Sequence, residues 1–143
     1  MKKDTTAYSS ARPTWDKSDC SVRALACATG VVYEVASMTF SAQGRRLKKG
    51  TDTGLSAKVY EDVLGMTRVR QVEGMDLETF TMVAQTGSYI LHKKGHAFAV
   101  VEGVVNDWEG TTRHSTRIVS CWKVTEQARA KMARMAELVK ELS

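Results

Sequence analysis

Cys20, His96 and Asp107 are residue types that together could transfer an acyl group. A thiolate nucleophile needs an imidazole within hydrogen-bonding distance and a third group that orients this imidazole. Cys20 falls where a helix is predicted to begin, and there the helix dipole and the unpaired amides lower the pKa of a thiol. His96 follows Gly95 and opens an apolar strand, which leaves room for a ligand. The pattern predicts a nucleophile and a base; a small core cysteine and a strand-end histidine are the alternative.

The third member follows from the geometry of a predicted hairpin. If residues 102–103 form a two-residue turn, Asp107 becomes the diagonal neighbour of His96 on the same face of the sheet. Asn106 then points to the opposite face. A one-residue bulge would exchange the two, so Asn106 is the alternative third member. In the competing interpretation, Asp107 only caps a loop.

The other cysteines and histidines are expected to have no chemical role. Cys27 lies two helical turns after Cys20 in an apolar run, and Cys121 lies in a strand beside a tryptophan, so both are predicted to be core residues. His92 is expected at the surface and His114 in a solvated loop. The three cysteines lack CxxC spacing, which predicts neither a disulfide framework nor a metal site and fits a reducing cytoplasm.

The elements that must position these residues follow from the hydrophobic periodicity. Ser18 and Asp19 are predicted to cap the helix that begins at Cys20, and Gly30 is predicted to end it. Residues 1–15 are expected to form an irregular arm, and residues 16–143 a single domain. Helices are predicted over 20–30, 32–43, 55–64, 75–85 and 125–142, and strands over 68–72, 88–92, 96–101, 104–108 and 117–124. Helices followed by an antiparallel sheet and a last helix indicate an α+β fold.

Composition bounds the class of protein. The chain has 143 residues, of which 43% are hydrophobic and 26% charged, as expected for one globular domain. No apolar run approaches the roughly 20 residues that span a bilayer. The net charge of +5 is only weak support for an acidic partner. Nucleic-acid-binding motifs are missing, and no cofactor is predicted.

Two segments are candidates for contact with a partner. A basic, glycine-bounded loop spans residues 45–54, and a narrow apolar stripe runs along the last predicted helix. A solvated connector and a helix that packs on its own domain are the alternatives. The candidate partner-binding residues are Arg45, Arg46, Lys48, Lys49, Met132 and Met135.

Two parts of the chain resemble the papain-like cysteine peptidase homologues that are common in phages. Residues 19–26 (DCSVRALA), followed by 28–30 (ATG) and Tyr33, are similar to their N-terminal signature. Residues 95–101 (GHAFAVV) and 102–108 (EGVVNDW) resemble their histidine hairpin. The resemblance covers roughly residues 15–35 and 88–110. It implies a papain-like core, a phage origin, and Cys20, His96 and Asp107 as nucleophile, base and orienting residue.

The chain departs from the papain pattern in two places. Papain-type enzymes carry a glutamine shortly before the cysteine, which helps to form the oxyanion hole, but residues 12–19 read RPTWDKSD. The Ser18 hydroxyl or the Cys20 backbone amide must then stabilise the oxyanion. Asn106 also resembles the asparagine of an asparagine-x-tryptophan motif that supplies papain's third residue, which keeps it as the alternative to Asp107.

The sequence predicts a thiol-dependent hydrolase or acyl transferase that acts on an amide, isopeptide or thioester bond. Its partner would be a protein or peptide substrate in the cytoplasm, a host protein if the chain is phage-encoded. The rival hypothesis is a catalytically inactive relative that binds and inhibits a host protein. The missing glutamine favours the rival, whereas Cys20 with the His96–Asp107 hairpin favours the enzyme. The sequence does not predict an oligomeric state.

Overall fold

A computed structural model describes residues 1–5, 19–45, 53–108 and 110–142. These residues form a six-stranded sheet with the strand order β1-β5-β4-β3-β6-β2, which is packed between helices. The elements are β1 (Lys3–Asp4), α2 (Cys20–Thr29), α3 (Tyr33–Ser41), α4 (Thr53–Ala57), the π-helical η1 (Lys58–Val63), β2 (Thr67–Arg68), the 3₁₀ turn η2 (Arg70–Val72), α5 (Leu77–Val83), β3 (Ser88–Lys93), β4 (His96–Val101), β5 (Val104–Asn106), β6 (Ser120–Lys123) and α6 (Glu126–Leu142).

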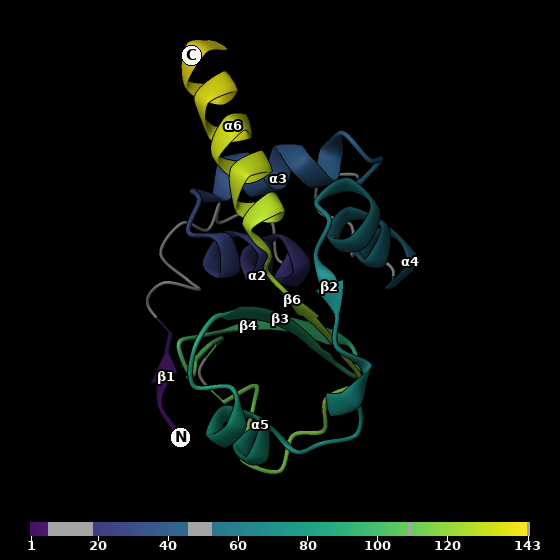
Figure 1. Cartoon of the computed structure of the whole chain (residues 1–143), viewed down its shortest axis with the longest axis vertical. Coiled ribbons are helices and arrows are strands. Elements are labelled where there is room, and N and C mark those ends of the chain that lie inside the picture. Colours follow the sequence, from purple (N-terminus) through teal and green to yellow (C-terminus); the bar gives the residue numbers. More distant parts are fainter. Residues whose placement is uncertain (6–18, 46–52, 109, 143) are drawn as a thin grey trace.

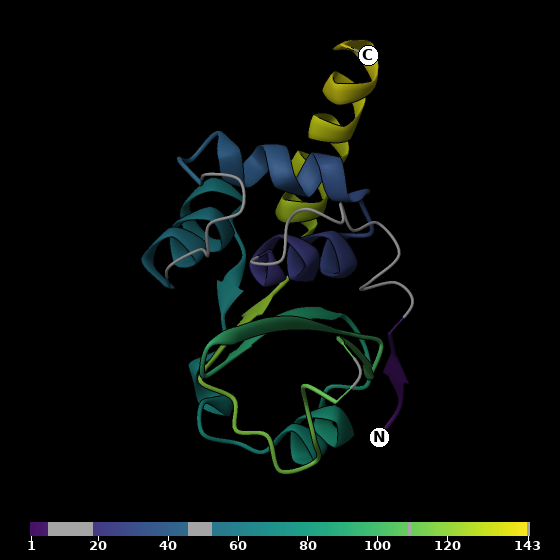
Figure 2. The same ribbon diagram turned by 180° about the vertical axis from the view of Figure 1, so that it is seen from behind.

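Helices cover the two faces of the sheet unequally. Figures 1 and 2 show α2, α3 and α6 stacked on one side of the sheet and the short α5 on the other. The larger hydrophobic core joins one face of α2 to the sheet around the fully buried Trp122. The smaller core packs Leu77 and Phe80 of α5 against Leu91 and Phe98. The fold is therefore α+β, as predicted.

The central hairpin has the predicted register. Val101 lies opposite Val104, and Ala99 lies opposite Asn106, so the turn contains only Glu102 and Gly103. Both turn residues have positive φ, 50° and 75°. This conformation is typical of the tight turns that match the twist of a hairpin, and it strongly favours glycine. The register contains no bulge, which decides the face on which residue 107 lies.

Four predictions about the elements were wrong in part. The sheet is mixed, because β1 pairs with β5 in parallel and the expected irregular arm contributes a strand. The predicted strand over 68–72 is the two-residue β2 followed by a 3₁₀ turn, and the predicted strand over 117–124 begins only at Ser120. The rest of the arm, residues 6–15, lies outside the described residues.

The ends of α2 show one correct and one wrong prediction. Gly30 ends the helix in the left-handed conformation, with φ 74°, and its N–H donates to the Ala26 carbonyl. Asp19 does not cap the helix with its side chain; its carboxylate instead accepts a hydrogen bond from Arg23, one turn on. The pair is buried and joins the residue before α2 to the first turns of the same helix.

The last helix packs on its own domain over its first half. Ala128 and Met132 are fully buried against α3 and its neighbours, Met135 is half-buried, and Leu142 is exposed. In Figure 1 the final turns of α6 extend beyond the other helices. Met132 is therefore a core residue, which corrects its assignment to a partner-binding surface. Within the described ranges, every helix is too short or too polar to cross a membrane.

Substitution Met132→Ala should lower the free energy of unfolding by about 2–5 kcal/mol, because it leaves a cavity between α6 and α3. The matched control is Met82→Ala on α5, where the side chain is 66% exposed and a change within about 0.5 kcal/mol is expected. Urea denaturation of the two variants measures both values. Equal stability would show that α6 does not belong to the core.

Candidate active site

The starts of α2 and β4 and the end of β5 meet at one place and bring Cys20, His96 and Asp107 together. Cys20 is the first residue of α2, His96 is the first residue of β4, and Asp107 directly follows β5. The thiol of Cys20 is hydrogen-bonded to the His96 ring, and His96 Nε2 lies 2.6 Å from Asp107 Oδ1. Because Nε2 is occupied by Asp107, the other ring nitrogen, Nδ1, serves the sulfur.

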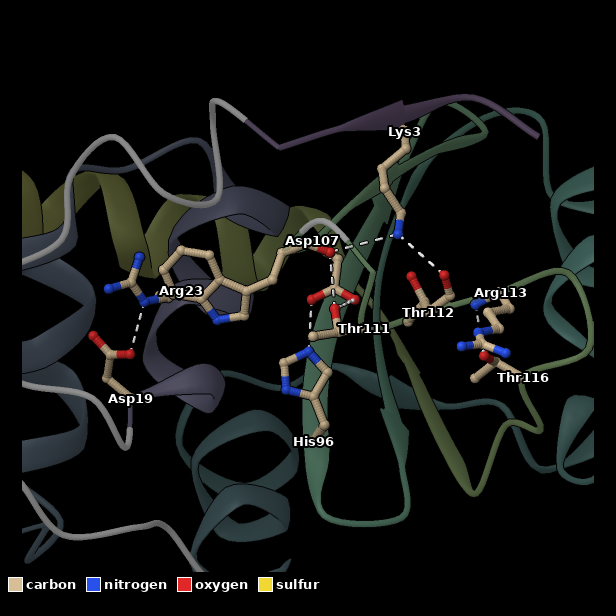
Figure 3. Close-up of polar contacts among 10 residues, drawn as sticks. Lys3, Asp19, Arg23, His96, Asp107, Thr111, Thr112, Arg113 and Thr116 are labelled. Carbon is tan, nitrogen blue, oxygen red and sulfur yellow. Dashed lines mark hydrogen bonds and ion pairs between the residues drawn. The ribbon is translucent and has the colours of Figure 1, made fainter.

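Asp107 is held as a buried anion. Its side chain is fully buried, Oδ1 contacts His96, and Oδ2 accepts a hydrogen bond of 2.5 Å from the Thr111 hydroxyl. Burial would raise the pKa of this carboxyl, but the hydrogen bonds from His96 and Thr111 outweigh burial and hold the pKa below its usual value. Figure 3 shows the chain of contacts from His96 through Asp107 to Thr111.

The charge on Asp107 changes the histidine. Burial would lower the pKa of His96, but the hydrogen bonds to Asp107 and Cys20 outweigh it and raise the pKa to about 9. At neutral pH the ring is therefore a cation, and both of its N–H groups are donors. One donates to the Asp107 carboxylate and the other to the sulfur of Cys20.

Cys20 differs from the two other thiols of the chain. Burial would raise its pKa, but hydrogen bonds from His96 and from the backbone N–H groups of Ala97 and Ser21 outweigh burial and lower it. Burial raises the pKa of Cys27 and of Cys121 to about 12. Cys20 is thus the thiol that ionises most readily of the three, and ionisation makes a thiol nucleophilic.

The backbone donor at Ala97 follows from the length of β5. This strand ends with Asn106, which lies opposite Ala99, so β5 has no partner for Ala97. The N–H of Ala97 instead donates to the sulfur of Cys20. The early end of β5 therefore supplies a donor that sequence reasoning missed, because residues 104–108 were expected to continue the strand.

A buried cation ties the nucleophile helix to the segment that carries Asp107. The Arg23 side chain is 1% exposed, and its Nε donates to Asp19 over 2.7 Å. Its guanidinium carbon lies 4.5 Å from the ring centroid of Trp108 and 5.9 Å from that of Tyr33. Arg23 thereby fixes the residue before Cys20 against the residue after Asp107. An arginine one turn into an apolar helix face was the signal that could have revealed this contact.

The other side of the same loop is fixed by β1. Lys3 Nζ donates to the Thr112 carbonyl over 3.1 Å and approaches the Trp108 carbonyl at 3.5 Å (Figure 3). The pairing of β1 with β5 places Lys3 beside Val105, close to this loop. Segments far apart in sequence therefore hold the loop of Asp107 from both sides. The local sequence pattern does not predict the contact of Lys3 with this loop.

A small cleft opens in front of the thiol. It measures about 140 Å³ and is lined by Cys20, Ser21, His92, Lys93, Gly95, His96 and Ala97.

His92 was expected at the surface, but its ring lies edge-on to Trp122 at a centroid distance of 4.8 Å. Burial, with the nearby charges of His96 and Arg68, lowers its pKa to about 4, so the ring is neutral. The strand alternation that buries Ile90 also turns His92 inward, and this corrects the prediction.

The remaining candidate residues fall into three groups. The Asn106 amide donates to the Val104 carbonyl of its own strand, so Asp107 is the residue bonded to His96. Arg45 is only 5% exposed and does not offer its charge to a partner, whereas His114 lies in an exposed loop as expected. Ser18, Arg46, Lys48 and Lys49 lie outside the described residues.

Among the described residues, no three histidine, cysteine or acidic side chains lie close enough together to hold a metal ion.

Comparison with protein-family models, with curated proteins and with solved structures gives no match for the chain. The chemistry of the site therefore rests on its geometry. A thiol, an imidazole and a carboxylate that are joined by hydrogen bonds can generate a nucleophile and transfer a proton.

Iodoacetamide at pH 7 should alkylate Cys20 at least about tenfold faster than Cys27 or Cys121, because only the pKa of Cys20 is lowered. Substitution His96→Ala should abolish this advantage and return the pH dependence of labelling to that of an ordinary thiol. Mass spectrometry of the labelled peptides measures the three rates separately. Equal labelling of the three thiols in the folded protein would exclude an activated Cys20.

Substitution Asp107→Asn keeps a hydrogen-bond acceptor but removes the charge that stabilises the His96 cation. The pH midpoint of Cys20 alkylation should therefore rise by about one unit. The matched control is Asn106→Ala, which should leave the midpoint unchanged. A larger shift in the control than in Asp107→Asn would assign the orienting role to Asn106.

Proposed function

We propose that this protein is a thiol-dependent hydrolase or acyl transferase of the papain-like type, with Cys20 as nucleophile, His96 as base and Asp107 as orienting residue. The observation that carries the proposal is the hydrogen-bonded chain from the Cys20 sulfur through His96 to the buried Asp107. A helix that begins at the nucleophile and packs on a sheet carrying the histidine supports the papain-like assignment. The two segments that resemble papain-like homologues contain these same residues.

In the proposed mechanism the resting site is a thiolate beside an imidazolium, which the lowered pKa of Cys20 and the pKa of about 9 of His96 both favour. The thiolate attacks the carbonyl carbon of the substrate and forms a C–S bond, and the carbonyl oxygen takes the electron pair. The imidazolium then gives its proton to the leaving nitrogen or sulfur as the bond to the carbonyl carbon breaks. The acyl group is now carried by Cys20.

Deacylation uses the same imidazole in the opposite direction. Neutral His96 accepts a proton from water, and the oxygen of this water attacks the acyl-cysteine carbonyl. Collapse of the intermediate releases a carboxylic acid and restores the thiolate and the imidazolium. An acceptor amine in place of water would give acyl transfer. Asp107 stabilises the ring as a cation and fixes its orientation throughout.

The oxyanion must be stabilised without a glutamine. The Cys20 backbone N–H at the start of α2 is the donor proposed here, because the amides of a first helical turn point away from the helix at its positive end. One missing oxyanion donor costs on the order of 3 kcal/mol, roughly a hundredfold in rate. We therefore propose a slow enzyme or one with a demanding substrate. The Ser18 hydroxyl, the other donor considered, lies outside the described residues.

The substrate classes that fit are amides, isopeptides and thioesters of a protein or peptide, and the proposed location is the cytoplasm, that of a host if the chain is phage-encoded. The cleft of about 140 Å³ is smaller than the roughly 300 Å³ of ordinary small-molecule sites. It accommodates the atoms around a scissile bond, so most of a larger substrate would lie outside it.

An alternative function, binding and inhibition of a host protein, is favoured by one observation. An apolar groove of about 320 Å³ lies between α3, η1 and α6, away from the thiol, and it is lined in part by Val63, Leu64, Met135 and the exposed Leu138. Lys131 and Arg134 stand at its edge. If the protein acts only as an inhibitor, substitution at Cys20 should leave its biological effect intact, and Leu138→Ser should remove that effect.

Incubation with p-nitrophenyl acetate should acylate Cys20, release nitrophenolate in a burst and continue at a slower steady rate as water deacylates the enzyme. Cys20→Ser should lose both phases but keep its fold and its partners, whereas the matched control Cys27→Ser should retain both. Absorbance measures the release, and intact-protein mass spectrometry measures the acetylated species. Full activity of Cys20→Ser would refute the proposed function.

A further inference from the structure

The walls of the cleft carry positive charge that the proposed chemistry does not use. Besides Cys20 and His96, the described residues that line it are Ser21, His92, Lys93, Gly95 and Ala97, and none of these five is acidic. Once the thiolate is acylated, the negative charge of the cleft wall is gone. Lys93 and the imidazole then remain beside the acyl group.

Lys93 lies next to the reacting atoms. It is the last residue of β3 and pairs directly with His96, the first residue of β4. Residues that face each other across antiparallel strands have Cβ atoms about 5 Å apart. The half-buried Lys93 side chain therefore begins beside the imidazole and lines the same cleft. Lys94, in the adjacent turn, is exposed and does not line the cleft.

Three carboxylates of the described residues near the site are bonded to groups other than Lys93. Asp107 is fully buried behind the imidazole and is bonded on both oxygens. Glu73 accepts a hydrogen bond of 2.8 Å from Arg68, and Glu61 accepts one of 3.0 Å from the Trp122 indole. None of these three carboxylates is bonded to Lys93, which lines the cleft.

Another residue that lines the cleft, His92, is neutral. The His92 ring is packed on Trp122, and its Nε2 is buried without a hydrogen-bond partner among the described residues. A neutral, partly apolar wall strengthens the attraction between Lys93 and an anion, because it excludes water from one side of the cleft.

We propose that the cleft selects an acidic peptide substrate, with a carboxylate that binds Lys93 beside the scissile bond. This inference rests on the proposed function, since it names the substrate class of that site. It also requires that Lys93 discriminate between probes that differ only in charge.

Iodoacetate and iodoacetamide provide such a pair. In both reactions the thiolate of Cys20 attacks the methylene carbon, a C–S bond forms, and iodide leaves with the electron pair of the C–I bond.

The measured quantity is the ratio of the iodoacetate rate to the iodoacetamide rate at Cys20. Lys93→Gln should lower this ratio about threefold at low salt, as expected for one charge several ångströms away. Because the ratio divides one rate by the other, it also removes any change that the substitution makes to the reactivity of the thiolate itself. The matched control Lys94→Gln should change the ratio less, and added salt should reduce the difference between Lys93→Gln and the unsubstituted protein.

The outcomes separate the inference from the proposed function. If iodoacetamide labels Cys20 rapidly but the ratio is the same in Lys93→Gln as in the unsubstituted protein, the acidic-substrate inference is wrong and the activated thiol stands. An equal fall in Lys93→Gln and Lys94→Gln also overturns it, because the effect would then belong to the general surface charge. If Cys20 reacts with iodoacetamide no faster than Cys27, the proposed function fails, and the inference fails with it.

A second measurement uses acyl groups. Succinyl and butyryl thioesters of N-acetylcysteamine have the same chain length, but only the succinyl group ends in a carboxylate. The Cys20 thiolate attacks the carbonyl, acquires the acyl group and expels the N-acetylcysteamine thiolate, which takes a proton. Succinylation should be faster than butyrylation in the unsubstituted protein and should lose its advantage in Lys93→Gln. An equal preference in both proteins would overturn the inference.

Discussion

The buried carboxylate of Asp107 imposes the main constraint on this structure. An anion removed from water is costly unless hydrogen bonds and a positive partner compensate it. Here His96 supplies the positive partner on one oxygen and Thr111 a hydroxyl on the other. The hairpin register, the loop after β5 and the packing of Trp108 all serve to keep these two contacts in place. The raised pKa of His96, and through it the lowered pKa of Cys20, are consequences of this compensation.

The site is built from the ends of three elements, so its geometry depends on how these elements are joined. The hydrophobic core between α2 and the sheet holds the helix against β4. Arg23 adds a directional restraint, because its guanidinium is bonded to Asp19 and lies over the ring of Trp108. A polar contact buried among apolar side chains thus helps to fix the start of α2, which carries the sulfur, relative to the segment that carries Asp107.

The hairpin and the residues it aligns could be predicted from sequence, because the side-chain period of a strand is two and the turn at Glu102 and Gly103 has a strong local signature. Helices α2 and α6 could also be predicted, from the spacing of their apolar residues. Contacts between distant segments could not be predicted in this way. The pairing of β1 with β5, the Ala97 donor and the inward turn of His92 depend on which strand ends where, and local periodicity carries no information on this.

The short strand β1 has a consequence for the order in which the molecule assembles. Lys3 and Thr112 are 109 residues apart in sequence, yet their contact holds the loop that carries Asp107. Closing a loop of this length is entropically expensive, whereas α2, α3 and the β3–β4 hairpin form from neighbouring residues. Most of the chain must therefore be synthesised before β1 can pair with β5. The loop that carries Asp107 is thus held by a contact that no local segment can form by itself.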